Sequence, residues 1–131
     1  MNVFEKNSNI FNLLSEGISE GIILVNTKQE IVATNSSAEE MFGYDKDGLI
    51  GKSLDCIIPK RFHNKHSDHF SSFMEKSEKR KMGNGLDLSG LRKNGVEFPV
   101  EAGLNPFVLY GNRYVMALVT DITDRKNYTQ N

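Results

Sequence analysis

Residues 83–125 constrain the fold most, because strand patterns and turn signals alternate along this stretch. A strand is expected to begin at Leu86-Asp87-Leu88 and to end in a turn at Arg92-Lys93-Asn94-Gly95. The Asn-Gly pair favours a type I′ hairpin, since both residues tolerate a positive φ. A second turn is predicted at Tyr110-Gly111-Asn112. The stretch therefore predicts three strands joined as two antiparallel pairs.

The two strands that follow the first turn differ in their side-chain pattern. In the earlier one, apolar side chains are expected on one face, at Val96, Phe98, Val100, Ala102 and Leu104. Glu97, Glu101 and Gly103 fall on the opposite face. Pro99 cannot donate to a neighbouring strand, so a bulge or a local edge is expected there. Residues 113–120 are apolar on both faces, which suits a central strand.

Two short strands are predicted near the N-terminus. Residues 20–26 predict a buried strand, and residues 30–34 predict the strand that returns beside it. In the return strand, Ile31 and Ala33 are expected on one face and Val32 on the other. This pair is expected to join the C-terminal strands in one antiparallel sheet.

Short helices are predicted around these strands. Asn35 can accept hydrogen bonds from free backbone N–H groups and so begin a helix that stops at Gly43. Residues 45–51 predict a further short turn of helix. Residues 4–16 predict an amphipathic helix, whose wide apolar arc leaves two interpretations open. It either covers the core or forms a dimer.

The longest helix is expected at residues 61–76. Five of its side chains fall on one side of a helical wheel: Phe62, His66, His69, Phe70 and Phe73. His66 is therefore predicted to face inward. The order of elements predicts an α+β fold, with one five-stranded antiparallel sheet, short helices and one longer helix on one of its faces, and an N-terminal amphipathic helix.

The composition excludes several classes of protein. A length of 131 residues predicts one domain. The formal net charge of -1 gives no reason to expect binding to nucleic acid or to an anionic membrane. No apolar run is long enough to cross a bilayer, and no signal peptide is recognised. The single cysteine, Cys56, rules out an internal disulfide and fits a reducing cytoplasm.

Several short motifs occur in a specific order and spacing. They are Glu20-Gly21-Ile22, Val25-Asn26, Ala33-Thr34-Asn35, Met41-Phe42-Gly43-Tyr44, Leu49-Ile50-Gly51-Lys52, residues 90–101 and Asp121-Ile122-Thr123-Asp124-Arg125-Lys126. In these motifs the chain resembles a PAS domain over essentially its whole length. The resemblance implies a sensor domain at residues 20–126, flanked by a helix in residues 1–19 and by a tail or linker at residues 127–131. It also implies a ligand pocket between the sheet and the helix before Gly83.

The spacing from Pro59 to His66 resembles a PAS subgroup that includes haem-binding oxygen sensors. In those relatives the corresponding histidine binds the haem iron, so the resemblance implies His66 as the ligand of a haem. It places the rest of the pocket at Phe62, Phe70, Asn84, Leu86, Ala102, Leu104, Val115 and Ala117. The relatives carry an arginine or a methionine on the far side of the iron, where this chain has Leu86 and Asn84. Two alternatives stay open: a core histidine without a cofactor, and a different small ligand.

Two other kinds of ligand site are possible from the residue types, a metal site at the histidines and a flavin site at Cys56. His63, His66 and His69 lie near Asp68, but His63 is rotated away on a helix, which favours a polar helix over a metal site. Cys56 lacks the surrounding motif of flavin-binding photoreceptors. Its apolar neighbours are expected to raise the thiol pKa, so a flavin-cysteinyl adduct is not expected.

The end of the last strand suggests how a signal leaves the domain. The resemblance implies that Asp121 and Thr123 form the hinge to an effector, such as a histidine kinase of a two-component system or a diguanylate cyclase. Thr123 can cap an outgoing helix. The expected function is that of a cytoplasmic, non-enzymatic sensory module that binds a small ligand, pairs as a homodimer and has no membrane contact of its own. The alternative is a ligand-free PAS module that mediates dimerisation.

Overall fold

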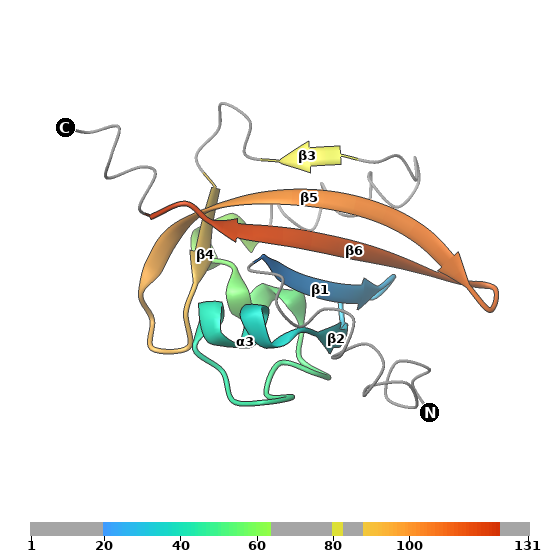
Figure 1. Ribbon diagram of the computed structural model, residues 1–131, viewed down its shortest axis with the longest axis horizontal. Coiled ribbons are helices and arrows are strands. Elements are labelled where there is room, and N and C mark those ends of the chain that lie inside the picture. The colour runs from blue at the N-terminus through green and yellow to red at the C-terminus, as the bar shows by residue number, and fades with distance from the viewer. Residues whose placement is uncertain (1–19, 64–79, 83–87, 124–131) are drawn as a thin grey trace.

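The computed structural model describes residues 20–63, 80–82 and 88–123 (Figure 1). The expected helix at residues 4–16, the tail at residues 127–131 and the part of the expected long helix after residue 63 lie outside the described residues. Within the described part of the chain, no helix is long and apolar enough to cross a membrane.

One antiparallel sheet organises the described residues. Its strands are β1 (Gly21–Asn26), β2 (Ile31–Thr34), β3 (Arg80–Met82), β4 (Leu88–Leu91), β5 (Glu97–Leu109) and β6 (Asn112–Asp121). The order across the sheet is β2-β1-β6-β5-β3, and β4 also pairs with β5. Because β3 and β4 pair with adjoining stretches of β5, the strands fill five positions. The predicted α+β fold and its antiparallel sheet are confirmed, whereas β3 was not predicted.

The centre of the sheet is β6, as its apolar pattern predicted. It pairs with β1 on one side and with β5 on the other. Val115 and Val119 face the main core, and Met116 and Leu118 face a second apolar cluster on the opposite side. A strand that is covered on both faces needs apolar side chains at every position, which explains the unbroken run.

The predicted type I′ turn is wrong for Asn94-Gly95 and occurs at the other hairpin. In the β5–β6 hairpin, Leu109 pairs with Asn112, and the two loop residues Tyr110 and Gly111 have φ values of 50° and 79°. Two consecutive positive φ values in a two-residue loop define a type I′ turn.

The β4–β5 loop is longer than the predicted two residues and needs a different turn. Gly95 has a φ of 90° and donates its N–H to the oxygen of Arg92. Asn94 instead uses its side-chain oxygen to accept from the N–H of Val96. A three-residue loop with glycine in the left-handed position suits this hairpin.

Proline residues do not interrupt β5. The strand continues through Pro106, which pairs with Val115. The bulge expected at Pro99 is absent, because the register with β4 continues through the pair of Ser89 and Pro99. Pro99 has no partner in β6, which agrees with the other expectation, a local edge. Pro99 accepts from the N–H of Ile122 but cannot donate in return, and the ladder with β6 ends one pair earlier, at Val100 and Asp121.

The face assignment of β2 was partly wrong. Ile31 packs in the main core, as part of the inner face, but Ala33 packs with Val32 in the cluster on the outer face. The register between β1 and β2 shifts between Leu24 and Val25, so that one residue of β2 is inserted there. Such an insertion reverses the face of the side chains that follow it.

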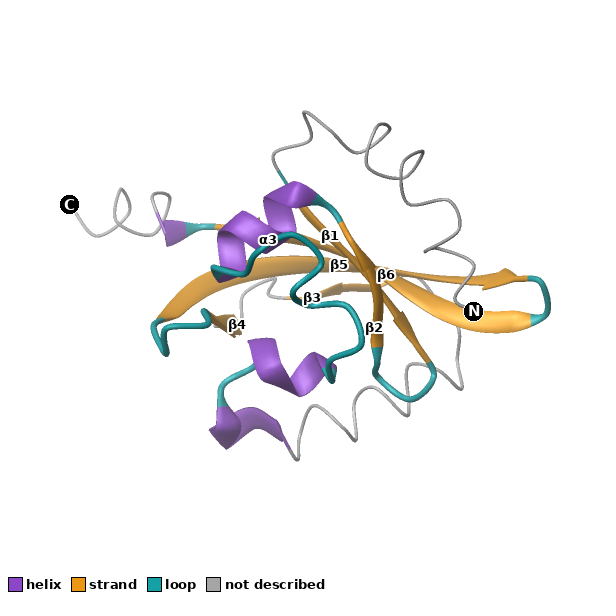
Figure 2. Cartoon of the chain, turned by 90° about the horizontal axis from the view of Figure 1, so that it is seen from below, coloured by secondary structure: helices purple, strands orange, loops and turns teal. Residues whose placement is uncertain are grey.

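Three short helices cover the inner face of the sheet: α3 (Ser36–Phe42) and the 3-10 helices η1 (Leu54–Ile57) and η2 (Lys60–Phe62). Asn35 caps α3 and Gly43 ends it in the left-handed conformation, as predicted. Ala38 and Phe42 of α3 and Ile57 of η1 pack in one core with the inner side chains of the sheet. Figure 2 shows these helices in purple beside the orange strands, seen from below the view of Figure 1. Residues 45–51 form turns instead of the predicted helical turn.

Candidate functional site

The inner face of β5 and β6 brings together four residues that were predicted to line a pocket. Leu104 pairs with Ala117, and the neighbouring positions on the same face are Ala102 and Val115. Val115 is fully buried in the core, and the other three are partly buried against it. All four side chains are apolar, so together they form a hydrophobic surface on this face of the sheet. The sheet thus places these four predicted pocket residues on one face, and their role as a pocket wall stays a prediction.

The opposite wall of that pocket rests on residues outside the described part of the chain. His66, Phe70, Asn84 and Leu86 belong there, and their roles remain predictions. Phe62 is described and is partly buried, with the guanidinium of Arg61 lying 4.5 Å from its ring centroid.

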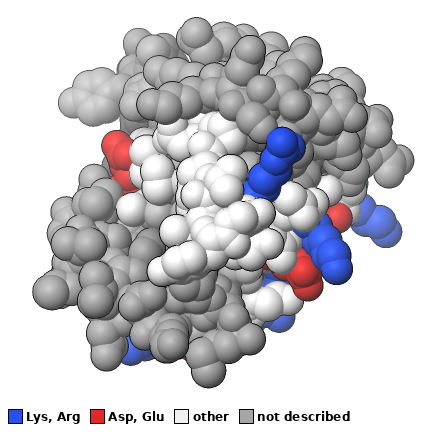
Figure 3. Space-filling view, turned by 90° about the vertical axis from the view of Figure 1, so that its right-hand side faces the viewer, with Lys and Arg blue, Asp and Glu red and all other residues white. Residues whose placement is uncertain are grey.

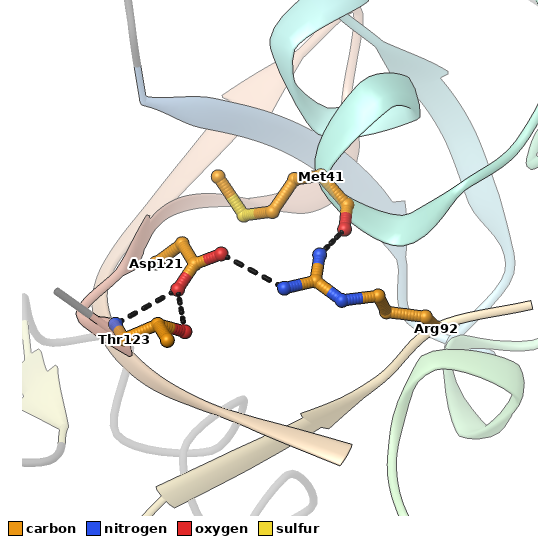
Figure 4. A network of polar contacts seen from close by, with 4 residues as sticks. All are labelled: Met41, Arg92, Asp121 and Thr123. Carbon is orange, nitrogen blue, oxygen red and sulfur yellow. Dashed lines mark hydrogen bonds and ion pairs between the residues drawn. The ribbon is translucent and has the colours of Figure 1, made fainter. Parts of the chain in front are cut away.

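Asp121 lies at the last position of β6 and accepts three hydrogen bonds (Figure 4). Its Oδ1 accepts from the backbone N–H of Thr123 at 2.9 Å and from the Thr123 hydroxyl at 2.5 Å. Its Oδ2 accepts from Nη2 of Arg92 at 3.1 Å. The two residues that were predicted to relay a signal are therefore joined directly. The residues of an outgoing helix after Thr123 lie outside the described range.

Arg92 connects this strand end to two other elements. Its Nη1 donates to the backbone oxygen of Met41, in the last turn of α3. Its guanidinium carbon lies 3.8 Å from the ring centroid of Phe98 in β5. A planar guanidinium can donate at its edge and stack with its face, so one side chain connects α3, β5 and β6. Figure 4 shows its hydrogen bonds to Met41 and Asp121.

Arg92 was not predicted to be a functional residue. Its position next to a turn suggested a solvated cation or a cross-strand ion pair, and the structure shows an ion pair with Asp121. The missing information was the pairing of strands: β4 and β6 lie on opposite sides of β5, so that the start of the β4–β5 turn comes close to the end of β6. Residues 29 positions apart in sequence thus form one ion pair.

The surroundings of Asp121 keep its carboxylate ionised. Partial burial is the largest single influence and raises the pKa, but the hydrogen bonds from Thr123 and Arg92 together outweigh it. The pKa of Asp121 is therefore lower than that of a free aspartate. A charged Asp121 is what the ion pair with Arg92 requires at neutral pH.

Cys56 occupies the apolar setting that its neighbours predicted. It is partly buried beside the main core, and burial raises the pKa of its thiol, although a hydrogen bond with Tyr44 acts in the opposite direction. The expected rise in the thiol pKa is confirmed. A thiol that stays protonated is a weak nucleophile.

An open groove lies at the far end of β6 from Asp121. It runs between the β1–β2 turn and the tip of the β5–β6 hairpin, and residues such as Asn26, Lys28 and Tyr114 line it. Figure 3 looks onto this end of the molecule, where uncharged atoms form most of the described surface and charged side chains lie around them. The described members of the predicted pocket, Phe62, Ala102, Leu104, Val115 and Ala117, do not border this groove.

The family profile described as PAS domain matches residues 19–124. Among curated relatives, the chain is 28% identical over 101 residues to "Oxygen sensor protein DosP" of Escherichia coli, which covers 77% of this chain and 13% of that protein. It is 23% identical over 109 residues to "Sensor protein FixL" of Bradyrhizobium diazoefficiens, which covers 83% of this chain and 22% of that protein. The chain thus spans less than a quarter of the length of these relatives.

The fold is also similar to solved structures. The PAS domain of an HTR-like protein from Haloarcula marismortui superposes with a TM-score of 0.73 at 24% sequence identity. The match covers 91% of this chain and 94% of that one. At this level of identity the likeness concerns the fold alone, and it agrees with the five-position antiparallel sheet.

Proposed function

The chain belongs to the PAS domain family, and on that premise we propose that it is the ligand-binding sensory module of a longer signalling protein. PAS domains are sensory modules in general, and this chain is related to sensor proteins. In the proposed function, a small molecule binds on the inner face of the sheet. Its occupancy changes how the end of β6 is held, and an effector such as a histidine kinase or a diguanylate cyclase responds. The module itself would catalyse no reaction and would work in the cytoplasm.

The observation that carries this proposal is the network around Arg92. One end of it is the backbone oxygen of Met41 in α3, a helix that packs on the inner face. The other end is Asp121, where β6 leaves the sheet. A ligand that favours one position of α3 would therefore favour one arrangement at Asp121 and Thr123. Differential binding to two arrangements is the physical requirement for a relay.

Haem is one candidate for the ligand. The described wall at Ala102, Leu104, Val115 and Ala117 is apolar and has small side chains, which suits a flat hydrophobic group. His66, the residue that would bind the iron, lies outside the described residues. A haem bound there would supply an iron that can bind a diatomic gas. The similarity to a protein named as an oxygen sensor supports this candidate.

The ligand is tested on the purified protein by an absorption spectrum and by mass spectrometry of released small molecules. Haem binding predicts an intense band near the blue edge of the visible spectrum, in protein as purified or after haem is added. His66→Ala should abolish that band, whereas His63→Ala should leave it unchanged, because the imidazole of His63 contacts the backbone oxygen of Ile58. A protein that takes up no haem and releases no other molecule would contradict the ligand-binding function.

The outer face of the sheet favours a second candidate, a ligand-free interaction module. Seven apolar side chains cluster there: Ile22, Leu24, Val32, Ala33, Phe107, Met116 and Leu118. In this alternative, two copies pair through the outer face and through residues 4–16. It predicts a dimer that dissociates on dilution, measured by sedimentation velocity, and no increase in stability with any pocket ligand.

A further inference from the structure

A pair of opposite charges joins η2 to the sheet. Arg61 of η2 donates from Nη1 to Oε2 of Glu97 and from Nη2 to Oε1 of the same carboxylate, both at 2.6 Å. Glu97 is the first residue of β5 and lies 36 positions further along the chain. Two parallel hydrogen bonds fix the direction as well as the distance of a contact, which a single ion pair does not.

The same guanidinium also covers the ring of Phe62. The Arg61 carbon that bears the three nitrogens lies 4.5 Å from the ring centroid. The edge of the guanidinium is thus used by Glu97 and its face by Phe62. Phe62 is the described member of the predicted pocket wall opposite the sheet. The contact therefore links a surface ion pair to a side chain that is expected to meet the ligand.

Among the described residues, the other polar contacts of η2 are local. Phe62 donates its N–H to the oxygen of Pro59, and the imidazole of His63 contacts the oxygen of Ile58. Both contacts lie within five residues in sequence, so they do not tie η2 to the sheet. Over the described residues, the bond from Arg61 to Glu97 is the hydrogen-bonded link between η2 and the sheet.

We propose that Arg61 and Glu97 form a salt-sensitive latch that holds η2, and with it Phe62, against β5. The proposal rests on the pocket of the proposed function and adds a regulator to it, namely ionic strength. The two side chains are 57% and 39% exposed, so dissolved salt can screen them. Exposed pairs of this kind are weak, and the open and latched arrangements should differ by only about two- to fivefold in population. A latch of that strength opens and closes readily.

The direct test is hydrogen exchange of the Phe62 backbone amide, measured by NMR and referenced to the Ile23 amide in β1. Raising the salt concentration from about 0.02 M to about 0.5 M shortens the screening length from roughly 20 Å to roughly 4 Å. In the unchanged protein, exchange at Phe62 should then accelerate about two- to fivefold. In Glu97→Gln and in Arg61→Gln, exchange should already be fast at low salt and should no longer respond to salt.

Matched variants separate the latch from a general effect of charge. Lys60→Gln removes the same charge from an exposed neighbour in η2, and Glu40→Gln removes a carboxylate from the exposed side of α3. Both should keep the salt response of the unchanged protein. The double variant Arg61→Glu with Glu97→Arg restores an ion pair with the charges exchanged and should recover part of that response. A salt response in Arg61→Gln equal to that of Lys60→Gln would overturn the latch.

A second readout separates the latch from the pocket. The dye 1-anilinonaphthalene-8-sulfonate fluoresces when it enters apolar sites, and its binding can be titrated at both salt concentrations. If the dye binds and Glu97→Gln changes its affinity about two- to fivefold relative to Glu40→Gln, both proposals are supported. If hydrogen exchange responds but no dye binds, the latch stands and the pocket is contradicted. If the dye binds but neither salt nor Glu97→Gln alters exchange or binding, the latch is wrong and the pocket stands.

Discussion

At the scale of single residues, Asn35 does more than the capping role that the sequence predicted. It is completely buried, and its Oδ1 accepts from the N–H of Ala38 and from the N–H of Ile22 in β1, each at 2.9 Å. Its Nδ2 donates to the oxygen of Glu20 at 3.0 Å. One amide thus fixes the start of α3 to the first strand. A side-chain amide carries both the carbonyl acceptor and the N–H donor that this position uses.

Asn35→Ala should therefore lower the free energy of unfolding by more than the loss of a helix cap alone would. We expect the free energy of unfolding to fall by about 2–4 kcal/mol, because the cap is lost and buried backbone groups are left without partners. Urea unfolding followed by circular dichroism measures the difference. Ser36→Ala, at the exposed first position of α3, serves as the control and should change stability by less than about 0.5 kcal/mol. Equal effects of the two substitutions would contradict this role of Asn35.

The lowered pKa of Asp121 predicts a dependence of stability on pH. Because the folded state holds the carboxylate in its charged form, Asp121 contributes stability above the pKa of an unfolded aspartate, about 3.9. That contribution should disappear as the pH falls through the lower, folded value. Asp121→Asn should thus be less stable than the unchanged protein at pH 6, and the difference should shrink below about pH 4. Urea unfolding of both proteins at pH 6 and pH 3 checks this, and a difference that grows in acid would refute it.

At the scale of elements, the approach of β4 to the core depends on a residue without a side chain. A Cβ atom on Gly90 would lie 2.9 Å from a ring carbon of Phe98 and 3.0 Å from one of Phe42. The two rings meet edge to face with their centroids 5.3 Å apart. The glycine thus lets β4 pass close to an aromatic pair that joins α3 to β5.

Gly90→Ala should separate these elements. The added methyl group has to push against two buried rings, so we expect a loss of about 1–3 kcal/mol in the free energy of unfolding. Gly103→Ala is the matched control in the neighbouring strand, because no atom of the described residues lies within 4 Å of the Cβ position there. The control should be neutral or slightly stabilising. Thermal unfolding of both variants distinguishes them, and a tolerated Gly90→Ala would show that β4 can shift.

At the scale of the whole molecule, the described residues form one unit that is crossed by the Arg92 network. The network joins the last turn of α3 to the end of β6 and passes the ring of Phe98 on the way. The inner wall of the predicted pocket lies on the same two central strands, β5 and β6. The predicted ligand site and the end of β6 would thus be held by the same two strands. This arrangement suits a relay, because a shift of one packed element displaces the element packed against it.

A double-mutant cycle measures that coupling. Arg92→Gln and Asp121→Asn should interact, with a coupling energy of about 0.5–1.5 kcal/mol, because each substitution breaks the same partly buried ion pair. Lys93→Gln combined with Asp121→Asn is the control, since the Lys93 ammonium lies over the ring of Tyr44 and not beside Asp121. The control cycle should be additive within about 0.5 kcal/mol. Additivity in both cycles would remove Arg92 from the relay.

The sequence by itself determined the features that depend on neighbouring residues. The unbroken apolar run of residues 114–119 required a central strand. The alternation in β5 put Phe98 and Val100 on the inner face, and the signals at Asn35 and Gly43 bounded α3. The predicted pocket residues of β5 and β6 share one face for the same reason, because side chains alternate along any strand. Each of these patterns is local, so it can be interpreted from neighbouring residues without knowledge of the rest of the chain.

Only the tertiary structure decided the features that depend on distant residues. Three features follow from which strand each segment pairs with: the shifted register of β2, the strand at residues 80–82 and the turn types of the two hairpins. The role of Arg92 follows from the approach of a turn to a strand end 29 positions later. Local propensities are weak and carry no information about such pairs. Strand pairing supplies that information, because it brings residues that lie far apart in the chain within hydrogen-bonding distance.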